Sequence, residues 1–580
     1  MQSGVGRRVV GWGLALGLTL GAGRAVVALP EQCGQTTSAE RRAAAAAAVG
    51  WFSRTQRPDG TFLYRYDAAA DTVLDGYNWV RHAGVLMSLE QARGAGVPGA
   101  AELAESGLAR VLDEVIRAGD RAALADGGAP TTGGSALLAV ALSERREHTG
   151  ATEHDELLAA LGRFLVSTVA ADGTVAERAD ASTLTPVPKS VSRFTTGEVA
   201  FALARLENVW PGEGWGDPVR RITRYLALDK AEQEGFVPDM ADHWGAYALA
   251  EVVSWDDAEL SRLTDWEVSW ARKQAGMLSV MVRFESQRSN SGLDRWLRGR
   301  TSVGSAVGTH GESMSAWAAV AAGESRLHGS LAGTLERLSC NAGLLADRQV
   351  GTEEAAGFAQ PSLVEGTWLW FGVTQMDDQQ HALSALLGAE SRLDAGGVLP
   401  RRDPVPSSAW LVAVVVLFVV NPVRFGCGAP TDRRKAAAGI AVAAATVAVI
   451  AALGATLLEA LDVSVPTAVV AAGLAVVVGG VVTALHPGAE RGPSLPGWGA
   501  ALVPAAVPLL LRPELAVLAL AAGPGGRTVA VVAGLVAAGA IGLVARPVHE
   551  GRLAVWAVRA TGVLAVALGV FLLVDGVFAV

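Results

Sequence analysis

The sequence predicts an all-α fold: an (α/α)6 toroid of six helical hairpins, followed by a bundle of about six transmembrane helices. Two observations predict this fold class. A short polar segment recurs at intervals of about 60 residues between positions 75 and 374, and each copy leads into an Ala/Leu-rich run. The last third of the chain consists mainly of Ala, Val, Leu and Gly, with its charges confined to short clusters.

This change in composition divides the 580 residues into four predicted parts. Residues 1–29 are a signal peptide or N-terminal anchor, because an arginine pair at Arg7 precedes an apolar run. Residues 38–398 form the toroid, which we expect to lie outside the cytoplasm. The Pro-containing segment 399–408 is a linker, and residues 409–580 form a transmembrane helical domain.

Six apolar runs in the last part approach the roughly 20 residues that a membrane-spanning helix needs. They cover residues 409–423, 436–458, 463–485, 498–522, 527–545 and 553–578. Arg512, Pro513 and Glu514 interrupt the fourth run, which predicts a kinked or broken helix. The basic loop 424–435 is expected in the cytoplasm by the positive-inside rule, which leaves residues 38–400 outside in a multi-pass cell-membrane protein. Arg559 is close enough to one end of the last run to reach the interface.

Six segments of one form mark the predicted starts of the inner helices. They are DGYN (75–78), TTGG (131–134), TTGE (195–198), DMAD (239–242), THGE (309–312) and TQMD (374–377). Each begins with Thr or Asp, which are good helix N-caps. Glu198 and Glu312 complete the S/T-x-x-E pattern of a capping box, so we assign them a structural role. For Asp377, capping and a functional role remain equally open.

The position seven residues after each cap points to a site. Four repeats carry an apolar residue there, whereas the first and sixth carry His82 and His381, one turn deeper on the same helix face. The first and last repeats are neighbours in a closed ring, so we expect the two histidines to meet at the mouth of the central cavity. The alternative is a structural seam, in which the histidines and an aspartate satisfy one another.

The predicted site combines side chains from several repeats at this mouth. The predicted catalytic residues are Asp377, Asp378, His381 and His82, as acids, bases and proton carriers. The predicted substrate-binding residues are Tyr77, Asn78, Arg81, Gln380, Asp242, His243, Trp244, His310 and Trp370. Arg81 and the helix N-termini favour an anionic group, and the aromatic side chains offer stacking surfaces.

Over about residues 38–395 the chain resembles the six-hairpin (α/α) toroid superfamily, which includes glycoside hydrolases, uronate-acting enzymes and, in related toroids, terpenoid cyclases. QRPDGTF (56–62) is similar to the Gln-to-aromatic turn of the cyclases, but their DxDD motif and the zinc residues of their relatives are missing. YNWVRHAG (77–84) and DDQQHALSAL (377–386) resemble segments of bacterial sugar-active toroids. The resemblance implies a carbohydrate substrate or ligand.

We therefore expect a toroid that acts on an anionic envelope or extracellular carbohydrate by general acid/base chemistry, with hydrolysis, elimination and epimerisation all open. The alternative is a non-catalytic receptor or scaffold that binds a glycan or peptide. Membrane lipid and a membrane-protein partner are expected contacts. The net charge of −9, without basic runs interleaved with aromatics, argues against a nucleic-acid partner.

Three cysteines, at positions 33, 340 and 427, lack the spacing of a zinc site, so we expect no metal and no cofactor. Cys33 just precedes the first outer helix, and Cys340 falls in the last outer-helix region. Closure of the ring would bring these two together outside the cytoplasm, where disulfides persist. We therefore expect a Cys33–Cys340 disulfide.

Overall fold

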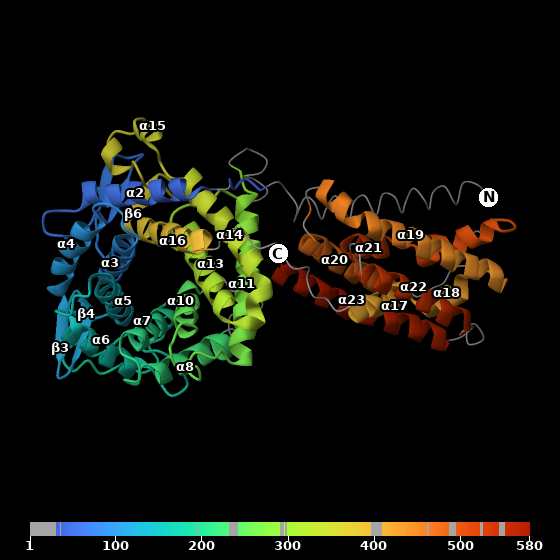
Figure 1. Ribbon diagram of the computed structural model, residues 1–580, viewed down its shortest axis with the longest axis horizontal. Coiled ribbons are helices and arrows are strands. Elements are labelled where there is room, and N and C mark those ends of the chain that lie inside the picture. The colour runs from blue at the N-terminus through green and yellow to red at the C-terminus, as the bar shows by residue number, and fades with distance from the viewer. Residues whose placement is uncertain are drawn as a thin grey trace. The chain divides into compact units, whose positions relative to one another are not determined.

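The computed structural model describes residues 31–34, 36–192, 194–230, 242–289, 295, 299–395, 409–460, 463, 465–486, 495–522, 526–544 and 552–579. The chain falls into two units, one of Glu31–Arg402 and one of Met1–Pro30 with Asp403–Val580. Figure 1 draws the helices of both units. The predicted signal or anchor (1–29) and linker (399–408) lie outside the described residues.

Within the described residues, the first unit is a ring of six helical hairpins, each with an outer and an inner helix (Figure 1). The outer helices are α2 (Ser38–Thr55), α4 (Ala100–Leu112), α6 (Asp155–Thr168), α8 (Gly216–Arg224), α11 (Asp265–Ser286) and α14 (His328–Asp347). The inner helices are α3 (Trp79–Gly94), α5 (Thr132–Thr149), α7 (Thr195–Val209), α10 (His243–Val252), α13 (Ser305–Gly323) and α16 (Met376–Ala395). Each inner helix packs against the next and α16 packs against α3, so the predicted toroid is confirmed.

The inner helices are buried on nearly all sides, because outer helices cover one face and neighbouring inner helices cover others. In α5, every residue from Thr132 to Glu144 is buried. The outer helix α4 is instead amphipathic and buries Leu103, Leu108 and Val111 on one face. A polar side chain on an inner helix must therefore find a partner or face the interior of the ring.

Two small sheets join the loops of the ring. β1 (Arg65–Asp67) pairs antiparallel with both β2 (Thr72–Leu74) and β6 (Val373–Gln375). Because β1 and β2 precede α3 and β6 leads into α16, this sheet ties the first hairpin to the last at the N-terminal ends of their inner helices. The second sheet contains β3 (Val115–Ala118), β4 (Arg121–Asp126) and β5 (Ala129–Pro130), and short helical segments are η1 (Tyr225–Lys230), η2 (Ser325–Leu327), α15 (Thr352–Ala355) and η3 (Pro361–Leu363).

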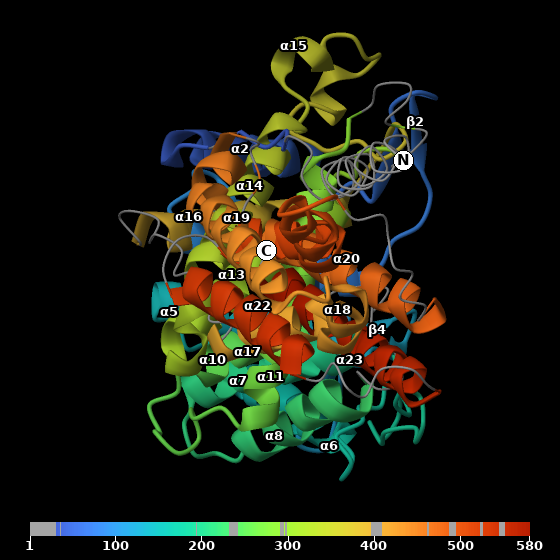
Figure 2. The ribbon, with the colours of Figure 1, turned by 90° about the vertical axis from the view of Figure 1, so that its right-hand side faces the viewer.

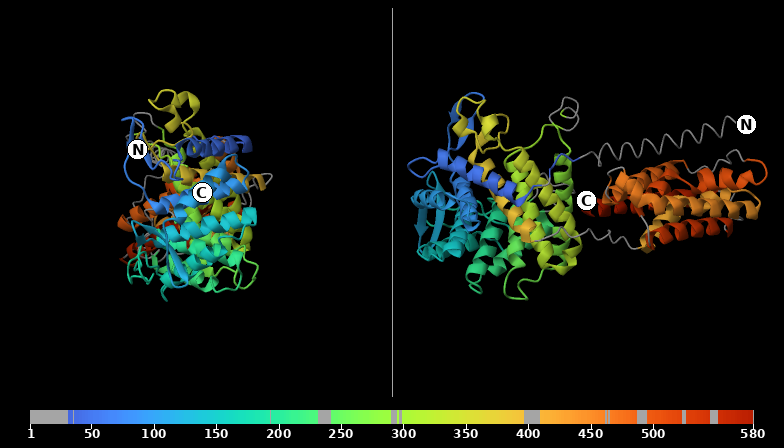
Figure 3. Two further views of the ribbon diagram at one scale, coloured as in Figure 1. Left: turned by 90° about the vertical axis from the view of Figure 1, so that its left-hand side faces the viewer. Right: turned by 45° about the horizontal axis from the view of Figure 1, so that its top comes forward.

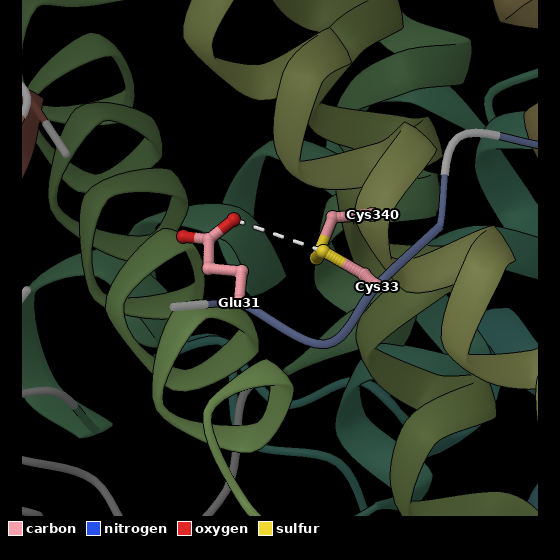
Figure 4. Close-up of side chains that lie close together, drawn as sticks. All are labelled: Glu31, Cys33 and Cys340. Atoms are coloured by element: carbon pink, nitrogen blue, oxygen red, sulfur yellow. Dashed lines mark hydrogen bonds between the residues drawn. A yellow bond between two sulfur atoms is a disulfide. The ribbon is translucent and has the colours of Figure 1, made fainter. Parts of the chain in front are cut away.

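Covalent and ionic contacts also close the ring. Cys33 and Cys340 form the expected disulfide, with Cα atoms 5.0 Å apart, and Figure 4 shows Glu31 beside it. Arg41 of α2 lies 3.0 Å from a carboxylate oxygen of Glu390 in α16. The beginning of this unit is therefore fixed to both α14 and α16, the last outer and inner helices.

The second unit consists of apolar helices that lie side by side (Figures 2 and 3). They are α17 (Ala409–Val420), α18 (Pro422–Gly428), α19 (Arg433–Ala460), α20 (Val465–Leu485), η4 (Ala501–Leu510), α21 (Pro513–Ala522), α22 (Gly526–Val544) and α23 (Arg552–Ala579). Among the described residues, three stretches are long and apolar enough to cross a membrane: Arg433–Leu458, Thr467–Leu485 and Val555–Leu573. Two further apolar helices are shorter, so the count of about six spans stays a prediction.

The predicted break in the fourth apolar run is confirmed. η4 contains non-helical backbone at Val503 and Val507, and α21 begins only at Pro513. At the break, the buried guanidinium of Arg512 donates to the carbonyl of Val419 at 2.7 Å and to the carboxylate of Glu514 at 3.0 Å. The ion pair compensates two charges that apolar surroundings would otherwise disfavour.

The two predicted capping boxes on inner helices are wrong. α7 begins at Thr195 itself and has no side-chain cap. α13 begins at Ser305, so Glu312 lies about two turns inside the helix. Capping boxes occur instead on outer helices, at Thr37–Glu40 of α2 and Thr264–Glu267 of α11. Capping therefore explains neither Glu198 nor Glu312.

Candidate functional site

A cavity of about 830 Å³ lies where the N-terminal parts of the six inner helices meet. Its wall includes Arg81 of α3, Thr132 and Gly133 of α5, Thr195 and Glu198 of α7, His243 and Trp244 of α10, Ser305, Thr309 and His310 of α13, and Asp377, Gln380 and His381 of α16. Every inner helix thus contributes a side chain to one polar chamber. This arrangement follows from the ring, because polar groups excluded from the packed helix faces gather at its mouth.

His381 and Glu312 form a buried pair in the cavity wall. Nδ1 of His381 donates to a carboxylate oxygen of Glu312 at 2.6 Å. Burial opposes a positive charge on His381, but Glu312, and then Asp377 and Asp378, outweigh it and raise the pKa of His381 to about 9. Burial likewise raises the pKa of Glu312, and its partner His381 opposes that shift. The pair therefore holds its proton on His381, which is an imidazolium at neutral pH.

His243 is the neighbour of this pair. Its ring centroid lies 5.2 Å from that of His381, edge to face. Burial, and then the charge of His381, lower the pKa of His243 well below its ordinary value of 6.5. Its Nε2 is buried and has no hydrogen-bond partner in the described part of the chain. One histidine is thus neutral while its neighbour is cationic, so one can accept a proton and the other can donate one.

Glycines in α13 allow α16 to approach this closely. A Cβ at Gly308 would lie 2.6 Å from the carbonyl carbon of His381, and a Cβ at Gly311 would lie 2.7 Å from the Cβ of Ala385. Real Cβ atoms essentially never come closer than 3.0 Å to such neighbours. Glycine at both positions therefore permits the close helix packing that brings Glu312 to His381.

Two further acids line the cavity. Burial, and then Asp242, raise the pKa of Glu198 to about 8, so its carboxyl group is protonated at neutral pH. Oδ1 of Asp377 lies 3.5 Å from Nε of Arg81 and 3.9 Å from Nε2 of His381. The cavity therefore combines a protonated acid, an ion-paired acid and the two histidines.

Eight of the residues predicted from the sequence line this cavity: Asn78, Arg81, His243, Trp244, His310, Asp377, Gln380 and His381. The other five predicted residues do not line it: Tyr77, His82, Asp242, Trp370 and Asp378. The cavity thus lies at the predicted end of the toroid, but five of the predicted side chains do not line it.

His82 is a buried core residue. The hydroxyl of Tyr77 lies 2.7 Å from its Nδ1, and its Nε2 lies 2.9 Å from the carbonyl of Gly107 in α4. Burial is the main cause that lowers the pKa of His82 to about 4, so the ring is neutral. The predicted meeting of His82 with His381 is wrong, because each ring has a different set of neighbours. Because its hydroxyl is hydrogen-bonded to His82, Tyr77 also belongs to the core and not to the cavity wall.

Two predicted aspartates are helix caps. Asp378 accepts a hydrogen bond of 2.8 Å from the backbone N–H of Ser305, at the start of α13. Asp242 accepts one of 2.9 Å from the N–H of Gly245 at the start of α10, and it also pairs with Lys230. Both carboxylates satisfy helix N–H groups that have no partner within their own helix. Trp370, the last of the five, lies in a second cavity.

Sequence reasoning missed Glu198 and Glu312 as site residues, because the T-x-x-E pattern offered a sufficient structural explanation. A signal was nevertheless present. An inner helix has almost no solvent-exposed face, so a glutamate on it has to be paired or to face the cavity.

His243, Glu312 and His381 each offer one possible metal-ligand atom, and these atoms lie within 4.8 Å of one another. Two imidazoles and a carboxylate suit a divalent transition metal. A metal bound there would have to displace the proton that His381 and Glu312 share.

No family model and no curated protein matches this chain. Solved structures similar to it include a cellobiose 2-epimerase from Spirochaeta thermophila, with 15% identity, a TM-score of 0.45, and coverage of 62% of this chain and 98% of that chain. An α-1,6-mannanase from Salegentibacter sp. has 13% identity, a TM-score of 0.42 and coverage of 61% and 99%. A D-mannose isomerase has 9% identity, a TM-score of 0.42 and coverage of 61% and 98%.

Proposed function

We propose that this chain is a membrane-anchored enzyme whose toroid lies outside the cytoplasm and modifies a carbohydrate by general acid/base catalysis. One observation carries the proposal: a neutral histidine, His243, and a cationic histidine, His381, face one polar cavity side by side. Groups whose pKa values are pushed apart in this way can act as base and acid at the same pH.

The proposed reaction is epimerisation or isomerisation beside the carbonyl group of an open-chain sugar. Nε2 of His243, which has no other partner among the described residues, takes the proton from the carbon next to the carbonyl. Nε2 of His381 donates to the carbonyl oxygen as negative charge develops there, because its Nδ1 is engaged by Glu312. In epimerisation a proton returns to the opposite face of the same carbon, and in isomerisation it returns to the former carbonyl carbon. As the product carbonyl forms, its oxygen gives a proton back to Nε2 of His381, so no water is consumed. Glu312 acts as a positioning residue that keeps His381 protonated.

The lining of the cavity suits a polyhydroxylated ligand. Trp244 and Phe194 offer aromatic surface, and Asn78 and Gln380 offer hydrogen-bonding groups. The side-chain nitrogen of Gln380 is buried without a partner in the described part of the chain, so a ligand oxygen would satisfy it. The anionic character expected of the sugar rests on Arg81, which already lies beside Asp377, and it stays a prediction.

Hydrolysis is a second candidate, and the state of Glu198 favours it. A carboxyl group with a pKa of about 8 is protonated at neutral pH and can donate to a glycosidic oxygen. Asp377 would then activate water on the opposite side of the sugar. The two reactions share the cavity but use different acids, so products and variants distinguish them.

Two features support placement of the toroid outside the cytoplasm. The Cys33–Cys340 disulfide suits an oxidising compartment. The basic loop 424–435, which follows the first apolar helix of the second unit, suits the cytoplasmic side. The second unit then serves as the membrane anchor. A non-catalytic glycan or peptide receptor is the alternative, with the same topology.

The test uses the full-length protein in detergent, incubated in D₂O with reducing sugars and with envelope glycan fractions. Proton NMR should show deuterium at the carbon next to the carbonyl and a second epimer or isomer. New reducing ends would favour hydrolysis by Glu198, and absorbance from an unsaturated uronate would indicate elimination. Binding without any turnover would support the receptor and contradict the enzyme.

A further inference from the structure

A second cavity, of about 450 Å³, lies at the same end of the toroid as the first. The two share neighbouring segments of chain, because Val303 lines the second cavity and Ser305 lines the first. Asp378 anchors this stretch by accepting from the N–H of Ser305. On the other side, the Trp370–Gly372 loop of the second cavity continues through β6 into the first turn of α16, which carries Asp377. A ligand longer than the first cavity would therefore reach the second.

The loop that forms one side of this second cavity is strained. Trp370 and Val373 exchange two backbone hydrogen bonds, of 2.9 and 3.0 Å, so Phe371 and Gly372 are the central residues of a tight hairpin turn. Both have positive φ, 53° and 83°, as a type I′ turn requires. Asn or Gly adopts the first of these positions readily, whereas Phe does so with steric strain. The Phe371 side chain is also 62% exposed, so its burial does not compensate for the strain.

The chemistry of this cavity suits sugar rings. Trp370 is 39% exposed beside Phe371, and the two ring centroids lie 4.7 Å apart. Their faces carry partial negative charge and attract the C–H groups of a sugar. The guanidinium of Arg300 lies 4.6 Å from the Phe371 ring centre and offers donors to hydroxyl groups. Asp347 and Glu354 on the same wall offer acceptors, and Arg348 offers further donors.

We propose that the second cavity is a distal glycan subsite, in which Trp370 and Phe371 hold further sugar units of a chain whose reacting end occupies the first cavity. The inference rests on the proposed function and narrows its substrate to an oligosaccharide. It also gives Trp370 the stacking role expected from the sequence, but in a different cavity. Contact with the ligand would explain why a phenylalanine stands at this strained and exposed position.

The experiment measures binding of maltohexaose, cellohexaose and α-1,6-mannohexaose, and of the matching disaccharides, to the full-length protein in detergent by titration calorimetry. At least one hexasaccharide should bind about tenfold more tightly than its disaccharide, because the two rings offer stacking surface to the further sugar units. Trp370→Ala and Phe371→Asn should abolish this advantage and leave disaccharide binding unchanged. Phe371→Asn is the sharper variant, because Asn suits a type I′ turn and should not lower the melting temperature.

The matched control is Trp210→Ala. Trp210 also lies against an arginine, Arg146 at 5.4 Å, but it lines neither cavity, so its replacement should leave the advantage intact. Equal affinity for hexasaccharides and disaccharides, or an advantage that survives Phe371→Asn, would overturn the subsite. If the protein turns over no sugar but still binds a hexasaccharide more tightly than its disaccharide in a way that depends on Trp370, only the proposed reaction is refuted. Failure of the reaction and failure of the subsite are therefore distinguishable.

Discussion

At the residue scale, the surroundings of a histidine decide its role more than its place along a helix does. His82 and His381 each stand seven residues after the first residue of the polar segment that precedes α3 or α16. His82 is buried with its Nε2 at the carbonyl of Gly107, and its pKa is lowered to about 4. His381 is also buried but faces the carboxylate of Glu312, and its pKa is raised to about 9. A carbonyl cannot compensate a buried positive charge as a carboxylate does.

The first prediction separates these two histidines. His381→Gln should lower kcat for the sugar that is turned over by about 10²- to 10⁴-fold, because it removes a proton donor. His82→Ala should instead leave kcat unchanged and lower the free energy of unfolding by roughly 2–4 kcal/mol, since it opens a cavity and leaves the Tyr77 hydroxyl without its partner. Turnover and chemical denaturation measure both effects. An equal loss of kcat in His82→Ala would contradict the assignment.

The second prediction concerns the positioning role of Glu312. Activity should require cationic His381 and neutral His243, so it should be flat near neutral pH and fall as the pH rises through about 9. In Glu312→Gln the carboxylate that keeps His381 charged is absent, and the alkaline limb of kcat/KM should move from about 9 toward lower pH. A purely structural glutamate would lower activity at every pH without moving this limb.

At the element scale, the start of a helix depends on contacts that its own sequence does not contain. The THGE segment has the pattern of a capping box, but α13 begins four residues before Thr309. Gly304, with a φ of 57°, turns the chain into the helix, and Asp378 accepts from the N–H of Ser305. The same S/T-x-x-E pattern does form a capping box at Thr37–Glu40 of α2, where the first turn is exposed to solvent.

The third prediction concerns the disulfide that ties the segment before α2 to α14. The Cys33–Cys340 disulfide joins residues 307 positions apart, so it restricts a very long loop in the unfolded chain. Cys33→Ser should therefore lower the free energy of unfolding by roughly 5–6 kcal/mol on the loop-entropy model. Thermal unfolding under oxidising conditions measures this loss. Cys427→Ser is the control and should change nothing, and an equal melting temperature for wild type and Cys33→Ser would contradict the disulfide's role.

At the scale of the whole molecule, buried histidines should make the stability of the toroid depend on pH in opposite directions. His82 has a lowered pKa of about 4, so its contribution is complete above its unfolded value of 6.5 and is lost as the pH falls from 6.5 to 4. His381 has a raised pKa of about 9, so its contribution is complete below 6.5 and is lost as the pH rises to 9.

The fourth prediction is therefore a bell-shaped dependence of melting temperature on pH. The acid limb should be reduced by roughly 3 kcal/mol in His82→Phe, because phenylalanine takes up no proton. His243 and His310, whose pKa values are also lowered by burial, should keep the rest of that limb. The alkaline limb should be reduced in His381→Gln. Calorimetry between about pH 4 and about pH 9 measures both limbs, because the pKa values of His82 and His381 in the folded protein set these limits. Identical curves for wild type and both variants would contradict the assignment.

The fifth prediction concerns membrane topology. If residues 31–402 lie outside and the loop 424–435 lies inside, a cysteine placed at Gly150 should react with an impermeant thiol reagent in intact cells. Gly150 is an exposed helix C-cap, so access to it does not require unfolding. Native Cys427 in the basic loop should stay protected until the membrane is permeabilised. Protection of the cysteine at 150 from the reagent would contradict this topology.

The sequence by itself determined the number and order of the hairpins in the ring. Six polar segments at a regular interval each precede an Ala/Leu-rich run, and helices buried on all sides need such runs. The same order made the first and last repeats neighbours and so predicted both the Cys33–Cys340 disulfide and much of the cavity mouth. Hydropathy marked the apolar second unit, and Pro513 between two charges marked its broken helix.

Only the tertiary structure decided which side chains share the cavity. His381 of the sixth repeat meets His243 of the fourth and Glu312 of the fifth, whereas the sequence paired it with His82 of the first. Repeat order fixes the neighbours along a ring but not the rotation of each helix about its axis. That rotation is set by close packing, here by Gly308 and Gly311 of α13 against α16, and it determines whether a histidine faces the cavity or the core.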